Sequence, residues 1–264
     1  MILPTKFPQK KLQQKETGEK RVWQKFDAAA SRYDRASFLQ QQAARHLLDL
    51  MGTVVPGSIW LDAGCGTGVL AKALANQEAR VWAVDLAPNM LKALEYDDRI
   101  QTILADIRNL PLADDMLDGA VSSFALHWLG ATIIEEILRV IQPGGEAWLA
   151  VPVQGSLAEV TARYPGLPVF AFEPAQCWLA QAGSTVQYWE TRRFSQSYSS
   201  LKALISAIRQ MGGNESGQAP STTSKSQWKQ WLGDQTPIDL SFEVLFLHLK
   251  KPATDHALAF LYES

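Results

Sequence analysis

The sequence predicts an α/β fold in which helices cover both faces of a mostly parallel β-sheet. Three observations carry this prediction. Apolar, strand-like runs alternate with helical patterns from residue 58 to residue 151, as in βαβ units with right-handed crossovers. The strand-like runs are almost continuously apolar, which is typical of strands buried on both faces. A glycine-rich turn, Gly64-Cys65-Gly66-Thr67-Gly68, joins the first of these strands to a helix, the usual place for a nucleotide-like cofactor.

Length and composition bound the class of protein. The 264 residues include 47% hydrophobic and 20% charged residues, which is typical of a globular protein with a sizeable core. No apolar run reaches the roughly 18 residues that a membrane span needs, and the N-terminus lacks the apolar centre of a signal peptide. Because there are only two cysteines, we expect no disulfide framework and a reducing, cytoplasmic location.

Each element of the alternating region follows from its residue pattern. Strands are predicted at 58–62, 80–84, 100–104, 118–123 and 146–151, and helices at 69–76, 88–95 and 132–141. A preceding helix runs from about Phe38 to Met51, because its apolar residues recur at helical spacing. Pro143-Gly144-Gly145 is predicted to turn the chain into the fifth strand.

After Val151 the pattern loosens. Helices are predicted at 157–163, 174–182, 199–211 and 227–232, a strand at 185–193, and a last antiparallel strand at 240–249. We interpret the chain as a basic, flexible N-terminal extension (1–21), a single domain (22–250) and a C-terminal tail (251–264). Segments at about 22–37, 154–172 and 195–235 are expected to form a largely helical cap on that domain.

The charges are distributed unevenly. The formal net charge is −2, yet residues 1–25 carry seven Lys and Arg against two Glu, and residues 192–229 carry six against one Glu. Each of these segments has a net charge of +5, which leaves −12 on the remainder. An acidic body argues against general nucleic-acid binding. A basic run is most often a solvated face, and that alternative stays open.

Carboxylates lie at the carboxyl ends of three successive predicted strands. Asp62 ends the first strand just before the glycine turn, Asp85 follows the second strand and Asp106 follows the third. A carboxylate after the second strand can accept both ribose hydroxyls, and Asp106 is placed to take an adenine amino group. Asp62 would repel a pyrophosphate but can pair with a cationic amino group. We therefore expect S-adenosylmethionine, which carries a sulfonium and an ammonium group, rather than NAD.

The segment Leu61 to Gly68, with Val84-Asp85-Leu86 and Ala105-Asp106-Ile107, resembles the motifs of class I S-adenosylmethionine-dependent methyltransferases. The resemblance implies a Rossmann-like, seven-stranded sheet of order 3-2-1-4-5-7-6, with strand seven antiparallel. It also implies cofactor contacts, which are Asp62, Gly64 and Gly66 near the methionine part, Asp85 at the ribose, Asp106 and Ile107 at the adenine, Leu86 and Met90 beside the ring, Phe124, and Arg32 at the cofactor carboxylate. Core packing is the alternative for Leu86 and Met90, and a solvated side chain is the alternative for Arg32.

Longer stretches narrow the resemblance to the malonyl-acyl-carrier-protein O-methyltransferases of biotin synthesis. The resemblance covers about residues 22–250, and its most discriminating parts are the region of Tyr33 and Gln154-Gly155-Ser156-Leu157. It implies methylation of the free carboxylate of a malonyl thioester, preferably malonyl-acyl carrier protein. The sequence departs from the family in three places. His127 replaces a glutamine, the segment before Val22 has no counterpart in the family, and residues around 160–172 align poorly.

This chemistry needs no general base, because a malonyl carboxylate is already ionised at neutral pH. The enzyme must align that carboxylate with the methyl group and exclude water. Tyr33 is the predicted catalytic residue, since its hydroxyl can reach the acceptor from an N-terminal lid; an interfacial tyrosine is the alternative. We expect His127, Trp128 and Arg209 at the substrate, with core packing still open for Trp128 and a surface arginine for Arg209.

Acyl carrier proteins are acidic, which suggests a function for the basic segment 192–229. The predicted docking residues are its six cations, Arg192, Arg193, Lys202, Arg209, Lys225 and Lys229. Two other functions stay open. A class I methyltransferase acting on a free small molecule, such as a quinone or a short carboxylic acid, would need no basic cap. A non-catalytic S-adenosylmethionine-binding protein could retain the glycines but would have no reason to retain Tyr33.

Overall fold

The computed structural model describes residues 24, 27–28, 37–167, 169–210 and 224–253. Its centre is one sheet of seven strands in the order β3-β2-β1-β4-β5-β7-β6. The strands are β1 (Ile59–Ala63), β2 (Arg80–Asp85), β3 (Ile100–Leu104), β4 (Leu117–Ser123), β5 (Ile141–Val153), β6 (Val186–Tyr198) and β7 (Ile238–Lys250). Only β7 runs antiparallel to its neighbours β5 and β6. The predicted fold class and strand order are confirmed.

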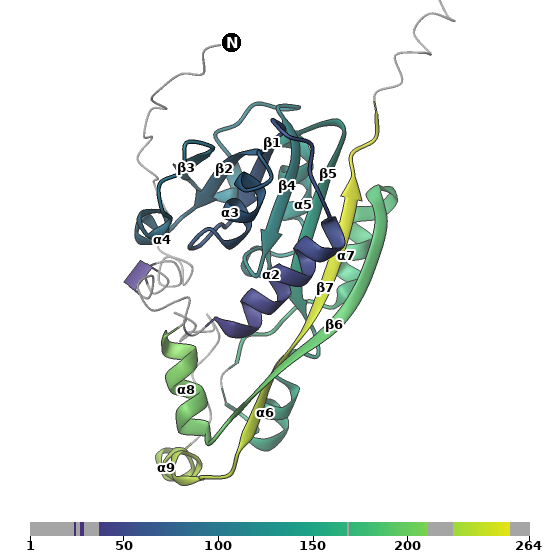
Figure 1. The fold of residues 1–264 in the computed structure, drawn as a ribbon. Coiled ribbons are helices and arrows are strands. Elements are labelled where there is room, and N and C mark those ends of the chain that lie inside the picture. The colour runs from purple at the N-terminus through teal and green to yellow at the C-terminus, as the bar shows by residue number, and fades with distance from the viewer. Residues whose placement is uncertain (1–23, 25–26, 29–36, 168, 211–223, 254–264) are drawn as a thin grey trace, which may run out of the picture.

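Helices pack on both faces of the sheet (Figure 1). Their bounds are α2 (Phe38–Met51), α3 (Val69–Ala75), α4 (Pro88–Ala93), α5 (Ile133–Val140), α6 (Ala158–Arg163), α7 (Ala175–Ala182), α8 (Leu201–Gln210) and α9 (Lys225–Gly233). Three short 3₁₀ turns follow strands or helices, η1 (Ile107–Asn109), η2 (Leu126–Trp128) and η3 (Gly183–Thr185).

The sheet separates two hydrophobic clusters. Apolar residues of α2, α3, α6 and α8 belong to one cluster, and those of α5 and α7 belong to the other. Strand β7 contributes to both, because its side chains alternate between faces: Phe246 lies in the first cluster, and Leu245 and Leu247 lie in the second. Both faces of the sheet are thus buried, which explains the continuous apolar runs of the central strands.

The two last strands are longer than their sequence pattern suggested. The predicted strand 185–193 continues to Tyr198, and the predicted strand 240–249 begins at Ile238, so that Tyr198 pairs with Ile238. Polar residues obscured the end of β6, since an edge strand does not need an apolar pattern. In Figure 1 the β6–β7 ribbon extends beyond the rest of the sheet, and α6, α8 and α9 gather around its far end. We call these three helices with that end of the ribbon the wing.

The predicted turn before the fifth strand is wrong in its placement. Pro143, Gly144 and Gly145 lie inside β5, which begins at Ile141. Pairing with β4 shifts from Leu117↔Ile141 to Gly119↔Glu146, so the glycines form an irregularity within the strand. Gly144 has φ +83° and its N–H donates to the carbonyl oxygen of Lys251 at 2.9 Å. A bulge of this kind uses the same residues as a turn.

No helix in the described ranges combines the length and the apolar character that crossing a membrane would require.

Candidate cofactor and acceptor site

The glycine turn lies at the carboxyl end of β1, where open α/β sheets bind ligands. Gly64 and Gly68 have φ values of +74° and +85°. A Cβ on Gly64 would lie 2.3 Å from the Cβ of Ala125, and one on Gly68 would lie 2.6 Å from Leu94, so both positions need glycine for packing. A Cβ on Gly66 would meet no described atom within 4 Å. The backbone at Gly66 is therefore the part of the turn that is open to a ligand.

Asp62 lies beneath this turn and is 1% exposed. Its Oδ2 accepts a hydrogen bond from the backbone N–H of Ala71 at 2.9 Å, in the first turn of α3. Burial raises the pKa of Asp62 to about 7, and the negative charge of Asp85 adds to the effect. Among the described residues no cation pairs with Asp62. A ligand ammonium group is the partner that would restore its ionised form.

Asp85 is held by the backbone around it. Its Oδ2 accepts from the N–H of Gly66 at 2.9 Å and its Oδ1 accepts from the N–H of Ala87 at 2.8 Å. Burial raises the pKa of Asp85, although these hydrogen bonds oppose the shift. An ionised carboxylate has about four acceptor positions, so two ribose hydroxyls can bind beside the two N–H groups.

Asp106 lies after β3 and is paired with its neighbour Arg108. The side chain of Arg108 contacts both carboxylate oxygens, with Nη2 2.6 Å from Oδ2, and its backbone N–H donates to Oδ1 at 2.9 Å. Burial opposes ionisation, but the hydrogen bonds from Arg108 outweigh it and keep the pKa of Asp106 below its usual value. The next residue, Ile107, is buried, and its Cδ1 would lie 3.4 Å from a Cβ on Gly64. Ile107 thus lies beside the glycine turn, and the contact of Asp106 with an adenine stays a prediction.

The two apolar residues after β2 differ in exposure. Leu86 is half-buried, whereas Met90 is 2% exposed. Met90 therefore matches the core-packing alternative more closely, and Leu86 is the more accessible of the two to a ligand.

A hollow between the glycine turn and α2 adds residues that sequence reasoning missed. Ser37, Gln40 and Gln41 line it from α2 and its N-cap, facing Asp62, Gly66 and Thr67. Ser123, at the end of β4, also lines it, and its buried Oγ has no hydrogen-bond partner among the described residues. Nothing in the spacing of a single serine after a strand marks it as a site residue.

Aromatic rings surround the residues that follow β4. Phe124 has a left-handed backbone, with φ +57°, and is half-buried. The ring of His127 lies 4.7 Å from that of Trp128 and 6.3 Å from that of Phe124. Burial lowers the pKa of His127 to about 3, so its imidazole is neutral at physiological pH. Phe170, Phe172 and Phe242 complete the cluster, and no sequence motif indicated them.

Four predicted site residues are not fully described by the structure. Arg32 and Tyr33 lie outside the described residues, and for Arg209 and Lys225 only the side chains do. The described residues on either side of Tyr33 lie near the site. Asp27 accepts a hydrogen bond from the N–H of Asn89 in α4 at 2.6 Å, and Ser37 lines the hollow.

The other predicted docking residues have different surroundings. Arg192 and Arg193 are consecutive residues of β6 and so point to opposite faces. Arg192 contacts His46 at 3.0 Å (Nη1 to Nδ1), and Arg193 pairs with Glu159 of α6. Lys202 and Lys229 lie exposed on α8 and α9.

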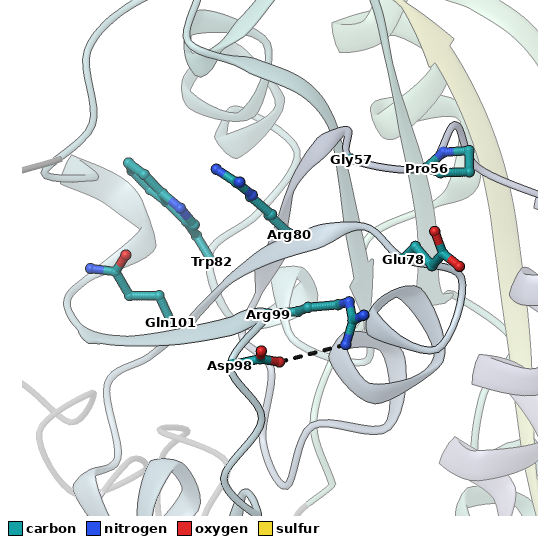
Figure 2. A pocket seen from close by; sticks show the side chains of 8 residues that line it. All are labelled: Pro56, Gly57, Glu78, Arg80, Trp82, Asp98, Arg99 and Gln101. Atoms are coloured by element: carbon teal, nitrogen blue, oxygen red, sulfur yellow. Dashed lines mark ion pairs between the residues drawn. The ribbon is translucent and has the colours of Figure 1, made fainter. Parts of the chain in front are cut away.

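A larger groove of about 660 Å³ lies at the opposite edge of the sheet. Pro56, Glu78, Arg80 and Arg99 come from the beginnings of β1, β2 and β3 or the turns before them. Figure 2 shows Arg80 and Trp82 projecting to the same side of β2 and an ion pair between Arg99 and Asp98. Because open α/β sheets bind their ligands at the carboxyl ends of the strands, the smaller hollow beside Gly66 is the candidate cofactor site.

The fold and the three carboxylates define a class I, S-adenosylmethionine-dependent methyltransferase. A family model described as a methyltransferase domain matches residues 61–149 and confirms this enzyme class and its cofactor. A solved phosphoethanolamine N-methyltransferase 2 from Haemonchus contortus, in complex with phosphomonomethylethanolamine and S-adenosylhomocysteine, shares the fold. Its TM-score is 0.53 at 19% identity, over 79% of this chain and 52% of that chain.

Curated relatives narrow the class. A malonyl-[acyl-carrier protein] O-methyltransferase from Alcanivorax borkumensis is 31% identical over 255 residues, which cover 89% of this chain and 87% of the relative. The biotin biosynthesis bifunctional protein BioHC from Cellvibrio japonicus is 28% identical over 89% of this chain and 50% of that protein. The chain belongs to the malonyl-[acyl-carrier protein] O-methyltransferase family.

Proposed function

We propose that this enzyme methylates the free carboxylate of a malonyl thioester, preferably malonyl-acyl carrier protein. The product is the malonyl methyl ester that begins pimeloyl and biotin synthesis. The observation that carries the proposal is the 31% identity to a malonyl-[acyl-carrier protein] O-methyltransferase over most of both chains. The two described cysteines, Cys65 and Cys177, are free, which supports action in a reducing cytoplasm.

The chemistry of the site supports carboxylate methylation. When bound, S-adenosylmethionine would supply an electrophilic methyl group to a carboxylate oxygen and would leave as the neutral thioether, so that no proton would have to move. His127 is neutral and has a pKa of about 3, so it is a poor general base. Attack neutralises opposite charges, and the aromatic surroundings of His127 favour such a step by excluding water.

The proposed roles of the residues are those that the family resemblance implies. Asp62, Gly64 and Gly66 contact the methionine part of the cofactor, and Arg32 binds the cofactor carboxylate. Asp85 binds the ribose, and the adenine lies against Asp106, Ile107 and Leu86. Met90 and Phe124 pack around these residues. At the acceptor, Tyr33 orients the carboxylate, His127 and Trp128 line the pocket, and Arg209 binds the malonyl or phosphopantetheine end.

We further propose that segments 22–37, 154–172 and 195–235 act as the cap of a single domain, between a basic extension at 1–21 and a tail at 251–264. The wing supports this proposal, because α6, α8 and α9 belong to those segments and lie together.

An assay with labelled S-adenosylmethionine tests the function. We expect a methyl ester from malonyl-acyl carrier protein and from malonyl-coenzyme A, and far less from free malonate. Tyr33→Phe should lower kcat by roughly 10- to 100-fold with little change in cofactor affinity. Transfer to a free quinone or short acid, with none to the thioesters, would instead favour a small-molecule methyltransferase. Cofactor binding without any transfer would favour a binding protein.

Carrier docking on the basic residues Arg192, Arg193, Lys202, Arg209, Lys225 and Lys229 remains a proposal, supported by the exposure of Lys202 and Lys229. Reversal of both charges, Lys202→Glu with Lys229→Glu, should raise the KM for malonyl-acyl carrier protein and weaken its salt dependence. The KM for a short malonyl thioester that lacks the carrier protein should not change. Arg80→Glu with Arg99→Glu, in the groove at the opposite edge, is the matched control. If both double variants raised the KM for malonyl-acyl carrier protein equally, docking on the wing would be contradicted.

A further inference from the structure

The aromatic cluster around His127 joins three distant parts of the chain. Phe124, His127 and Trp128 follow β4, Phe170 and Phe172 precede α7, and Phe242 belongs to β7. The His127 ring lies 5.4 Å from Phe170 at 87° and 5.6 Å from Phe172 at 38°. Phe242 lies 5.1 Å from Phe124 and 6.1 Å from Phe172. We call these six residues the aromatic cluster.

The aromatic cluster adjoins the cofactor loop. Phe124 lies between Ser123, which lines the hollow beside Gly66, and Ala125, which packs against Gly64 closely enough to exclude a Cβ there. The cluster is therefore next to the candidate cofactor site, on the side of β4 and β7 rather than of β2 and β3. It is the part of the described structure best placed to surround the acceptor.

His127 is the one polar side chain of this cluster apart from the indole of Trp128. Its Nδ1 is buried and has no hydrogen-bond partner among the described residues. A buried polar atom that lacks a hydrogen-bond partner destabilises the fold, and a ligand atom that binds to it relieves this cost. The surrounding rings also keep the imidazole neutral, so the fitting ligand atom is a neutral hydrogen-bonding group rather than a carboxylate.

We propose that the aromatic cluster holds the thioester end of the acceptor and that His127 donates a hydrogen bond from Nδ1 to the thioester carbonyl oxygen. Either nitrogen of a neutral imidazole can carry the proton. His127 is thus a residue that positions the acceptor and determines specificity. This inference rests on the proposed function, since a malonyl thioester has one carboxylate for methylation and one neutral carbonyl for the cluster.

The consequence is discrimination against free dicarboxylates. Free malonate would place a second carboxylate against the aromatic rings and a neutral histidine. Transfer of an unpaired charge into such surroundings is strongly unfavourable. A malonyl thioester places an uncharged carbonyl there instead. The cluster therefore selects thioesters of malonate by excluding the charge of the free acid.

Two substitutions separate the hydrogen bond from the ring. His127→Phe keeps an aromatic ring without a donor, and His127→Gln keeps an N–H donor without a ring. We expect His127→Phe to lower kcat/KM for malonyl-coenzyme A by about tenfold, to reduce the preference over malonate, and to leave the Kd for S-adenosylhomocysteine unchanged. The kcat/KM of His127→Gln for malonyl-coenzyme A should stay within about threefold of that of the parent enzyme. The matched control is His248→Phe, since His248 also stacks on an aromatic ring, that of Trp148 at 4.0 Å. This pair lies near the start of the β5–β7 pairing, away from the glycine turn.

A second measurement does not depend on turnover. The chain has four histidines, so the imidazole ¹⁵N resonances can be assigned by substitution. In the protein with S-adenosylhomocysteine, malonyl-coenzyme A should shift the Nδ1 resonance of His127, and free malonate should not. An unchanged resonance, or equal losses in His127→Phe and His127→Gln, would overturn the inference. A shifted resonance without methyl transfer would uphold it and refute the proposed function.

Discussion

Asp62 combines two roles that conflict in the absence of cofactor. Its carboxylate accepts from Ala71 and so helps to satisfy the first turn of α3. The same burial raises its pKa to about 7 from its ordinary value of 3.8. A carboxyl whose pKa is raised in the folded state destabilises the fold progressively as pH rises from 3.8 to about 7, and the loss persists above that pH.

Asp62→Asn should therefore stabilise the cofactor-free protein and weaken cofactor binding. Asparagine can still accept from the N–H of Ala71, but it carries no charge to desolvate. At pH 8 we expect the free energy of unfolding to rise by about 1–3 kcal/mol, below the full shift because a protein partly relaxes around a buried charge. The gain should shrink as pH falls from about 7 towards 3.8. Urea unfolding at several pH values measures this, with calorimetric titration of S-adenosylmethionine for the affinity.

The outcome that would contradict this account is a destabilised variant at pH 8 whose cofactor affinity is unchanged. Asp62 would then act only as a helix cap. Asp106→Asn is a useful comparison, because the pKa of Asp106 is lowered and its removal should cost stability instead.

Among the elements, α6 is attached to the end of the β6–β7 ribbon by few but specific contacts. Tyr164, directly after α6, is 2% exposed, and its hydroxyl donates to Oδ2 of Asp234 at 3.0 Å. Arg163 donates to the same oxygen at 3.0 Å and to the carbonyl oxygen of Pro237 at 2.7 Å. The ring of Tyr164 also packs against that of Trp231 in α9 at 5.5 Å. These contacts join two helices of the wing.

Tyr164→Phe should loosen the wing without unfolding the sheet. The ring packing remains, and one hydrogen bond to a carboxylate is lost, which corresponds to about 1–2 kcal/mol of stability. If the wing acts as a cap, the KM for the malonyl thioester should rise several-fold while the Kd for the cofactor stays constant. Tyr188→Phe is the control, because Tyr188 is exposed and its hydroxyl donates to Glu190 at 2.7 Å on the edge strand. An unchanged KM in Tyr164→Phe would argue against a capping role.

The sequence predicted which helices and strands exist better than it predicted where they end. It also predicted residues in short motifs better than residues that only the folded chain brings together. Helix α2 and strand β3 match their predicted bounds. Apolar periodicity defines the helix and Gly52 ends it. The last five residues of β6 were not predicted as strand, because they are mostly polar. The bulge at Gly144 was predicted as a turn, because glycine is common in both. Asp62, Asp85 and Asp106 could be proposed from the sequence because each lies at or just beyond the carboxyl end of a strand. Phe170, Phe172 and Phe242 could not, since only the folded chain brings residues before α7 beside β7.

At the scale of the whole molecule, cofactor and acceptor contact different parts. The glycine turn, Asp85 and Asp106 belong to the half of the sheet formed by β1, β2 and β3, whereas the wing extends from β6 and β7 at the other end. The aromatic cluster lies between them, since it takes residues after β4 and from β7. Binding of the two ligands should therefore protect the chain in two separate steps.

Hydrogen exchange measured by mass spectrometry can resolve these steps. S-adenosylhomocysteine alone should slow exchange at Gly64–Gly68 and at Asp85–Ala87, where the backbone borders the cofactor site, and leave α8 and α9 unchanged. Addition of malonyl-coenzyme A should then slow exchange in segments 158–167, 201–210 and 225–233. In His127→Phe the first step should persist and the second should weaken, because the acceptor loses a contact but the cofactor does not. If the cofactor alone slowed exchange in the wing, the cofactor site and the wing would respond to the same ligand. The proposal that the wing closes on the acceptor would then be wrong.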